Sequence, residues 1–74
     1  GMAIGIPLND FNDNDRIKVM SLLYRGDIVK GGRGYRGALY NLSKKKDISK
    51  IDKYIRKNHN VPEYLKTRWN KLNN

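Results

Sequence analysis

The sequence contains no cysteine, only one histidine and only two prolines among its 74 residues. Without cysteine the chain has no disulfide framework, and this favours a reducing, intracellular compartment. The apolar run Leu22–Tyr24, among the longest, is far shorter than the about 20 residues that span a bilayer. No charged segment followed by an apolar stretch opens the chain, so we expect no signal peptide. These absences predict a cytoplasmic protein with no membrane partner.

Acidic residues are scarce as well. The chain contains seven Asp and Glu residues and 16 Lys and Arg residues, which gives a formal net charge of +9. Residues 1–24 carry slightly more acidic than basic groups, so essentially all the excess positive charge lies after Tyr24. Self-repulsion on this scale destabilises a compact state and favours an anionic partner. A merely solubilising surface is the alternative interpretation.

Groups for catalysis or metal binding are few. His59 is the only histidine, and no serine has an evident base near it in the sequence. Residues 9–15 are spaced like a calcium-binding loop, but Asp15 and Ser21 stand where such a loop needs glycine and glutamate. Helix capping explains this stretch better. We therefore predict no enzymatic activity, no metal site and no cofactor.

The length of the chain indicates one domain or part of one, and an apolar fraction of 38% leaves little material for a core. We expect residues 1–12 to be an irregular segment, with Gly1 a cloning remnant before Met2. Residues 13–74 are expected to form a single basic helical domain. Compact helix packing would stabilise such a domain, and a homodimer partner would add buried surface.

Capping residues and apolar spacing predict a mainly α, single-domain bundle of about four short helices with a Gly/Arg-rich loop. The loop, at 26–34, is rich in glycine, and the apolar residues that follow it have helical spacing. The alternative is an α+β fold with a short hairpin at residues 26–42. The expected helices run from Asn12 or Asp13 to about Arg25, from Tyr35 to the 44–46 lysines, from Asp47 or Ser49 to about 57, and from Pro62 to about Leu72.

The apolar stripes of these helices predict one shared core. The first helix is apolar over most of its circumference, so we expect the others to pack around it. Tyr24 falls on its apolar face, whereas Tyr40 and Tyr64 fall outside the stripes of their helices. The residues expected to be buried together are Ile17, Met20, Leu39, Ile51, Ile55, Leu65 and Trp69.

Three lysines, Lys50, Lys53 and Lys57, share the face of the third helix opposite its isoleucines. Ammonium groups about one turn apart can reach successive phosphates, although lysine contacts a phosphate as a point charge and does not read bases. The run Lys44–Lys46 precedes this helix and adds to the same basic region. The alternative is a solvated helix face with no ligand.

The glycine-rich stretch 31–37 contains Arg33 and Arg36 and resembles in composition the Arg-Gly segments of RNA-binding proteins. Glycines there let the backbone approach phosphates, and arginines stack on bases or bind phosphate oxygens. A simple connecting turn is the alternative interpretation.

Together these patterns predict a small basic protein that contacts the phosphate backbone of DNA or RNA. The alternative is a protein-interaction module, an adaptor or inhibitor, that docks on an acidic partner protein. The second helix, a tight turn and the third helix form the expected nucleic-acid-facing unit, although they fit the standard helix-turn-helix pattern poorly. The expected contact residues are Arg33, Arg36, Lys44, Lys45, Lys46, Lys50, Lys53 and Lys57.

Overall fold

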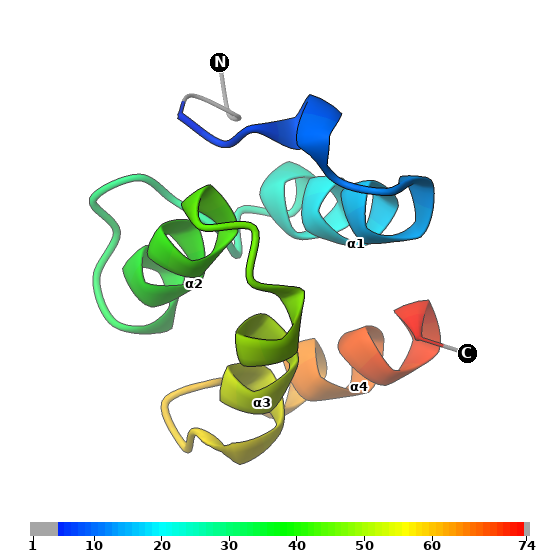
Figure 1. The fold of residues 1–74 in the computed structure, drawn as a ribbon. Helices are drawn as coiled ribbons and strands as arrows, with labels where there is room; N and C mark the ends of the chain where they lie inside the picture. Colours follow the sequence, from blue (N-terminus) through cyan, green and yellow to red (C-terminus); the bar gives the residue numbers. More distant parts are fainter. Residues whose placement is uncertain (1–4, 74) are drawn as a thin grey trace.

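The computed structural model describes residues 5–73 as a bundle of four helices preceded by one 3-10 turn (Figure 1). No strand occurs among these residues, so the mainly α fold is confirmed and the alternative hairpin at 26–42 is wrong. Gly1, expected to be a cloning remnant, lies outside the described residues. The elements in chain order are η1 (Leu8–Asp10), α1 (Asp13–Tyr24), α2 (Tyr35–Lys44), α3 (Ile48–Lys57) and α4 (Glu63–Leu72).

Side-chain caps fix the starts of two helices. Asn12 Oδ1 accepts a hydrogen bond from the backbone N–H of Asp15 at 2.8 Å, and α1 follows. Asp47 Oδ1 accepts one from the backbone N–H of Lys50 at 3.2 Å, and α3 follows. Each cap satisfies a donor that the first turn of a helix leaves unpaired. The expected capping role of the 9–15 stretch is therefore confirmed, and α4 begins directly after Pro62 as predicted.

The loop between α1 and α2 folds back onto the start of α2. The backbone N–H of Val29 donates to the Arg36 carbonyl at 3.3 Å. The Gly32 carbonyl oxygen lies so close to Gly37 that a Cβ at position 37 would collide with it. Gly34, directly before α2, has a φ of 63°, which glycine adopts at little cost. The fold itself therefore requires glycine at positions 34 and 37, whatever the loop binds.

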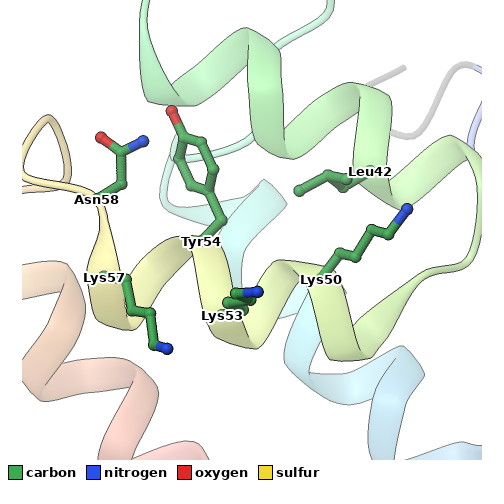
Figure 2. Close-up of a pocket in the computed structure, with 6 residues that line it drawn as sticks. All are labelled: Leu42, Lys50, Lys53, Tyr54, Lys57 and Asn58. Atoms are coloured by element: carbon green, nitrogen blue, oxygen red, sulfur yellow. The ribbon is translucent and has the colours of Figure 1, made fainter.

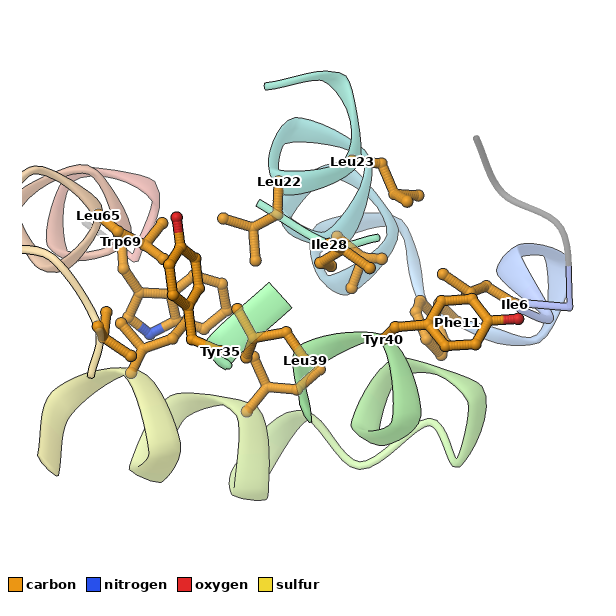
Figure 3. Packing of buried hydrophobic residues seen from close by; sticks show 14 residues of the cluster. Ile6, Phe11, Leu22, Leu23, Ile28, Tyr35, Leu39, Tyr40, Leu65 and Trp69 are labelled. Carbon is orange, nitrogen blue, oxygen red and sulfur yellow. The ribbon is translucent and has the colours of Figure 1, made fainter. Parts of the chain in front are cut away.

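Side chains from all four helices and from their connections meet in one core (Figure 3). Trp69 and Leu65 of α4 lie beside Tyr35 and Leu39 of α2, and Leu22 of α1 points toward them. Five of the seven residues expected in the core are buried in it. The core consists of Ile6, Phe11, Val19, Leu22, Leu23, Ile28, Tyr35, Leu39, Tyr40, Ile51, Ile55, Val61, Leu65 and Trp69.

The prediction is wrong for the outer face of α1. Ile17 and Met20 were expected in the core, but they are 60% and 50% exposed, and Tyr24 is 81% exposed. The helix instead buries its other side through residues such as Val19 and Leu22. Because apolar side chains surround most of α1, spacing alone does not determine which side packs inward. The helix lies at one side of the bundle and not at its centre (Figure 1).

Tyr40 is the opposite case. The sequence places it outside the apolar stripe of its helix, but the structure buries it. Only 5% of it is exposed. The N-terminal segment covers it, since Ile6 and Phe11 belong to the same buried cluster and lie beside it in Figure 3. A Cβ at Gly5 would lie 2.5 Å from the Tyr40 hydroxyl. The segment 1–12 therefore contributes to the core through its described part.

Candidate nucleic-acid interface

Buried isoleucines fix the orientation of α3. Ile51 and Ile55 have no exposed surface, so this side of the helix is held against the core. Lys50, Lys53 and Lys57 are exposed on the other side. The helix thus has one apolar and one basic face, as its sequence spacing predicted.

A shallow groove of about 360 Å³ follows this basic side, next to α2 (Figure 2). In Figure 2, the side chain of Lys50 extends toward α2 near Leu42, whereas Lys57 points away from α2. Tyr54 rises between them toward α2. The groove is lined by Leu42, Lys50, Lys53, Tyr54, Lys57 and Asn58.

Three residues of this groove were not among the predicted contact residues: Leu42, Tyr54 and Asn58. The structure makes Tyr54 half-buried, packed against the core but open to the groove. The available signal was helical spacing, because Tyr54 stands four residues after Lys50 and four before Asn58.

The only carboxylate within α3, that of Asp52, is bound on the α4 side of the helix. Its Oδ1 accepts hydrogen bonds from Trp69 Nε1 at 2.7 Å and from Arg56 Nε at 2.9 Å. Partial burial acts to raise the pKa of Asp52, but the bonds from Trp69 and Arg56 outweigh it and hold the pKa below its usual value. The carboxylate stays ionised in the contact between α3 and α4. It therefore does not neutralise the lysines of the basic side.

Two of the predicted lysines take part in exposed ion pairs. Lys50 Nζ lies 3.7 Å from Asp47 Oδ2, and Lys46 Nζ lies 3.7 Å from Asp10 Oδ2. Such exposed pairs are weak, so a phosphate can replace the carboxylate at little cost. Two further lysines have no ion-pair partner among the residues that the structure describes: Lys53 and Lys57.

The remaining predicted lysines lie at the C-terminal end of α2. The Lys44 ammonium lies 5.7 Å from the centre of the Tyr40 ring, and Lys45 is exposed. Positive groups suit this end of a helix, where the backbone dipole is negative. Residues 45–47 alone connect α2 to α3, with Lys46 in the left-handed region at a φ of 58°. This tight turn keeps the lysine run next in space to the start of α3.

The two predicted arginines lie outside the lining of the groove, and they differ from each other in their contacts. Arg36 Nε donates to the Gly26 carbonyl at 3.0 Å, and its guanidinium lies 4.8 Å from the centre of the Tyr35 ring. Arg33 is exposed, with no polar partner in the described part of the chain. Neither arginine lines the groove. Arg36 therefore holds the loop in place, and Arg33 is the arginine that is open to a ligand.

A second group of polar side chains is buried behind the loop. Asp27, only 1% exposed, accepts hydrogen bonds at Oδ1 from Tyr64 at 3.0 Å and from Tyr35 at 3.3 Å. Its Oδ2 accepts one from Arg68 at 3.3 Å. Burial, the bond to Tyr64 and the negative charge of Asp27 all raise the pKa of Tyr35 above its usual value. This cluster joins the loop to α2 and α4, and the hydrogen bonds of its carboxylate are already satisfied.

No protein-family model, curated protein or solved structure matches this sequence. Within residues 5–73, His, Asp and Glu side chains do not gather in a group of three that could hold a metal ion. None of the helices in that range has the length and apolar character needed to cross a bilayer. His59 is exposed in the connection between α3 and α4.

Proposed function

We propose that this chain binds the phosphate backbone of a nucleic acid through one surface, here called the lysine face. The observation that carries the proposal is the division of α3. Its isoleucines are buried in the core, and Asp52 is held by Trp69, so the basic side is left without an acid from its own helix. The lysine face consists of Lys44, Lys45, Lys46, Lys50, Lys53 and Lys57, and we expect the exposed Arg33 of the loop to add one further phosphate contact.

The geometry of the lysine face favours binding that does not depend on base sequence. Successive lysines of α3 lie about 4.5 Å and about 6 Å apart along the helix axis, and each flexible side chain can reach a different phosphate. The groove contains no arginine, the residue that most often reads a guanine edge through two hydrogen bonds. Lysine contacts of this kind supply affinity and position but carry no sequence information.

Titrations of DNA and RNA across a salt series test this proposal. Labelled duplex DNA, single-stranded DNA and structured RNA are titrated with the full chain, and fluorescence anisotropy gives the binding constant K. If about five phosphate contacts form, the slope of log K against log salt on duplex DNA is expected near −4 to −5. Replacing Lys50, Lys53 and Lys57 with Gln should flatten this slope by about two to three units.

A matched variant separates a local effect from a loss of net charge. This variant replaces with Gln the residue directly after α1, Arg25, and two residues of α4, Lys66 and Lys71. It removes the same charge from another part of the chain, so the slope should change much less. Circular dichroism of both variants checks that the chain stays folded. If the unmodified chain binds none of the three nucleic acids at about 50 mM salt, or if both variants flatten the slope equally, the lysine face is not the binding surface.

A further inference from the structure

The outer side of α1 carries an exposed apolar stripe. Ile17, Met20 and Tyr24 are spaced by three and four residues, so their side chains lie along one line on the helix. They are 60%, 50% and 81% exposed. Single exposed apolar residues are ordinary, but several in one line on a small soluble chain indicate a contact surface.

Two hollows lie between α1 and α4, beside the stripe, and Ile17 is the stripe residue that lines one of them. The smaller, of about 250 Å³, includes Ile17 and Lys18 in its lining. The larger, of about 420 Å³, includes Arg25 and Lys71. Leu72 lines both hollows, and the two together are here called the α1–α4 groove. Figure 1 shows α1 and α4 on the same side of the bundle, away from α2.

The charges around the α1–α4 groove have one sign. No carboxylate lines either hollow. Two of its basic groups are already engaged, because Lys18 donates to Asn73 at 2.9 Å and Arg68 is bonded to the buried Asp27. Two others have no polar partner in the described part of the chain: Arg25 and Lys71. The groove therefore offers the positive charges of Arg25 and Lys71 beside apolar surface, whereas Lys18 and Arg68 are paired with Asp15 and Asp27.

We propose that the α1–α4 groove binds an acidic amphipathic helix of a partner protein. Apolar side chains of the partner cover Ile17, Met20 and Tyr24, and its carboxylates face Arg25 and Lys71. A partner helix of this kind carries its own apolar anchors at three- and four-residue spacing, so they form a line that can lie along the stripe. Since α1 has 12 residues, a partner helix of about three to four turns matches its length.

Charge favours this occupant over a second copy of the chain. Two copies would each carry a formal net charge of +9, and this excess of positive charge opposes their association, whereas carboxylates on a partner favour it. The groove shares no residue with the lysine face, so this proposal does not depend on nucleic-acid binding.

A designed helical peptide tests the proposal on the full chain. A labelled peptide of about 18 residues has leucine along one face and glutamate beside it. Fluorescence anisotropy should show saturable binding that weakens with salt. Two matched peptides should not bind measurably, one with lysine in place of glutamate and one with serine in place of leucine.

Variants of the chain locate the binding surface. Met20→Ser and Tyr24→Ser should each weaken peptide binding about tenfold, because each removes apolar area that the partner would bury. The pair Arg25→Gln and Lys71→Gln should weaken it about three- to tenfold and reduce its salt dependence. The control pair Lys53→Gln and Lys57→Gln removes equal charge from the lysine face and should leave peptide binding unchanged.

Several outcomes would overturn the proposal. One is that the acidic peptide does not bind the chain. The same holds if the control pair weakens peptide binding as much as the pair Arg25→Gln and Lys71→Gln does. Another is that analytical ultracentrifugation shows a dimer which Met20→Ser dissociates, since the occupant is then a second copy. A third is that the chain binds vesicles of anionic lipid but not the peptide, and that Tyr24→Ser abolishes the binding to vesicles.

Discussion

The indole Nε1 of Trp69 on α4 donates a 2.7 Å hydrogen bond to Asp52 Oδ1 on α3. Trp69 is fully buried, so the bond lies where the apolar core meets the surface. Arg56 shares the same carboxylate oxygen and also donates to Asn70 Oδ1 at 2.9 Å, which adds a second link between the two helices. The side of α3 that carries Asp52 is thereby fixed toward α4, and its lysines must point away.

This bond predicts a specific dependence of stability on pH. The pKa of Asp52 is lower in the folded chain than its ordinary value of about 4. Its contribution to the free energy of unfolding is therefore complete above the ordinary value and is lost as the pH falls below it. Asp52→Asn should flatten the decline of the thermal midpoint between about pH 5 and pH 2.

A second variant shows whether Trp69 is part of the cause. Trp69→Phe keeps an aromatic ring but removes the donor, so it should also flatten the acid-side decline and should lower stability at neutral pH. Asp13, exposed at the start of α1, is a suitable control carboxylate. If Asp13→Asn and Asp52→Asn change the pH profile alike, the Asp52 contact has no special role in acid stability.

Replacement of Gly37 with alanine should destabilise the chain, which is the opposite of the usual effect of alanine inside a helix. Alanine inside a helix normally stabilises it by about 1 kcal/mol relative to glycine. Here the added Cβ would collide with the Gly32 carbonyl oxygen, which is backbone and cannot move without shifting the loop. Gly37→Ala should therefore lower the free energy of unfolding, by about 1–3 kcal/mol.

The measurement is urea unfolding followed by circular dichroism. Asn41→Ala, at an exposed position of the same helix, serves as the control and should be neutral or slightly stabilising. A Gly37→Ala chain as stable as the unmodified one would mean that the loop does not pack on α2 as closely as described.

The two sides of the bundle should respond very differently to loss of an isoleucine. Ile51 is fully buried, so Ile51→Ala should cost about 2–4 kcal/mol, a large part of the stability expected for a small domain. Ile17 is 60% exposed, so Ile17→Ser should change stability by less than about 0.5 kcal/mol. Urea unfolding measures both, and similar losses for the two variants would contradict the orientation of α1.

The contrast between α3 and α1 shows how far the sequence alone could predict this fold. In α3, isoleucines and lysines occupy opposite sides, so spacing determines both the buried and the open face. In α1, apolar residues occur on both sides, and only contacts with distant segments decide that Val19 is buried and Ile17 is not. The same limit applies to Tyr40, which is buried by the N-terminal segment and not by its own helix.

The candidate site was predictable to a similar extent. Lys50, Lys53 and Lys57 are one group because a helix places them there, and local spacing is enough to find them. Spacing also places Tyr54 on the same side of the helix as Lys50, but that its ring opens into a groove depends on how α2 packs on α3, which spacing does not contain. Arg33 and Arg36 looked equivalent in a glycine-rich stretch, yet the path of the loop gives one a structural contact and leaves the other free.

That difference between the two arginines gives the last prediction. Arg36→Gln removes the bond to the Gly26 carbonyl and the contact with the Tyr35 ring, so it should lower the free energy of unfolding by about 0.5–1.5 kcal/mol. Arg33→Gln breaks no contact within the described chain and should leave stability unchanged. Urea unfolding compares the two variants.

Nucleic-acid binding should rank the same two arginines in the opposite way. The Arg33 guanidinium is free to contact a phosphate, so Arg33→Gln should reduce the salt slope by about one unit, as one lost contact does. Arg36 must first break its contacts with Gly26 and Tyr35 before it can bind a phosphate. Arg36→Gln should therefore change the slope less than Arg33→Gln, measured at a temperature where the variant is folded. If Arg36→Gln weakens binding more than Arg33→Gln without loss of stability, the Arg36 contacts are not a structural anchor, and the loop binds the ligand through Arg36 instead.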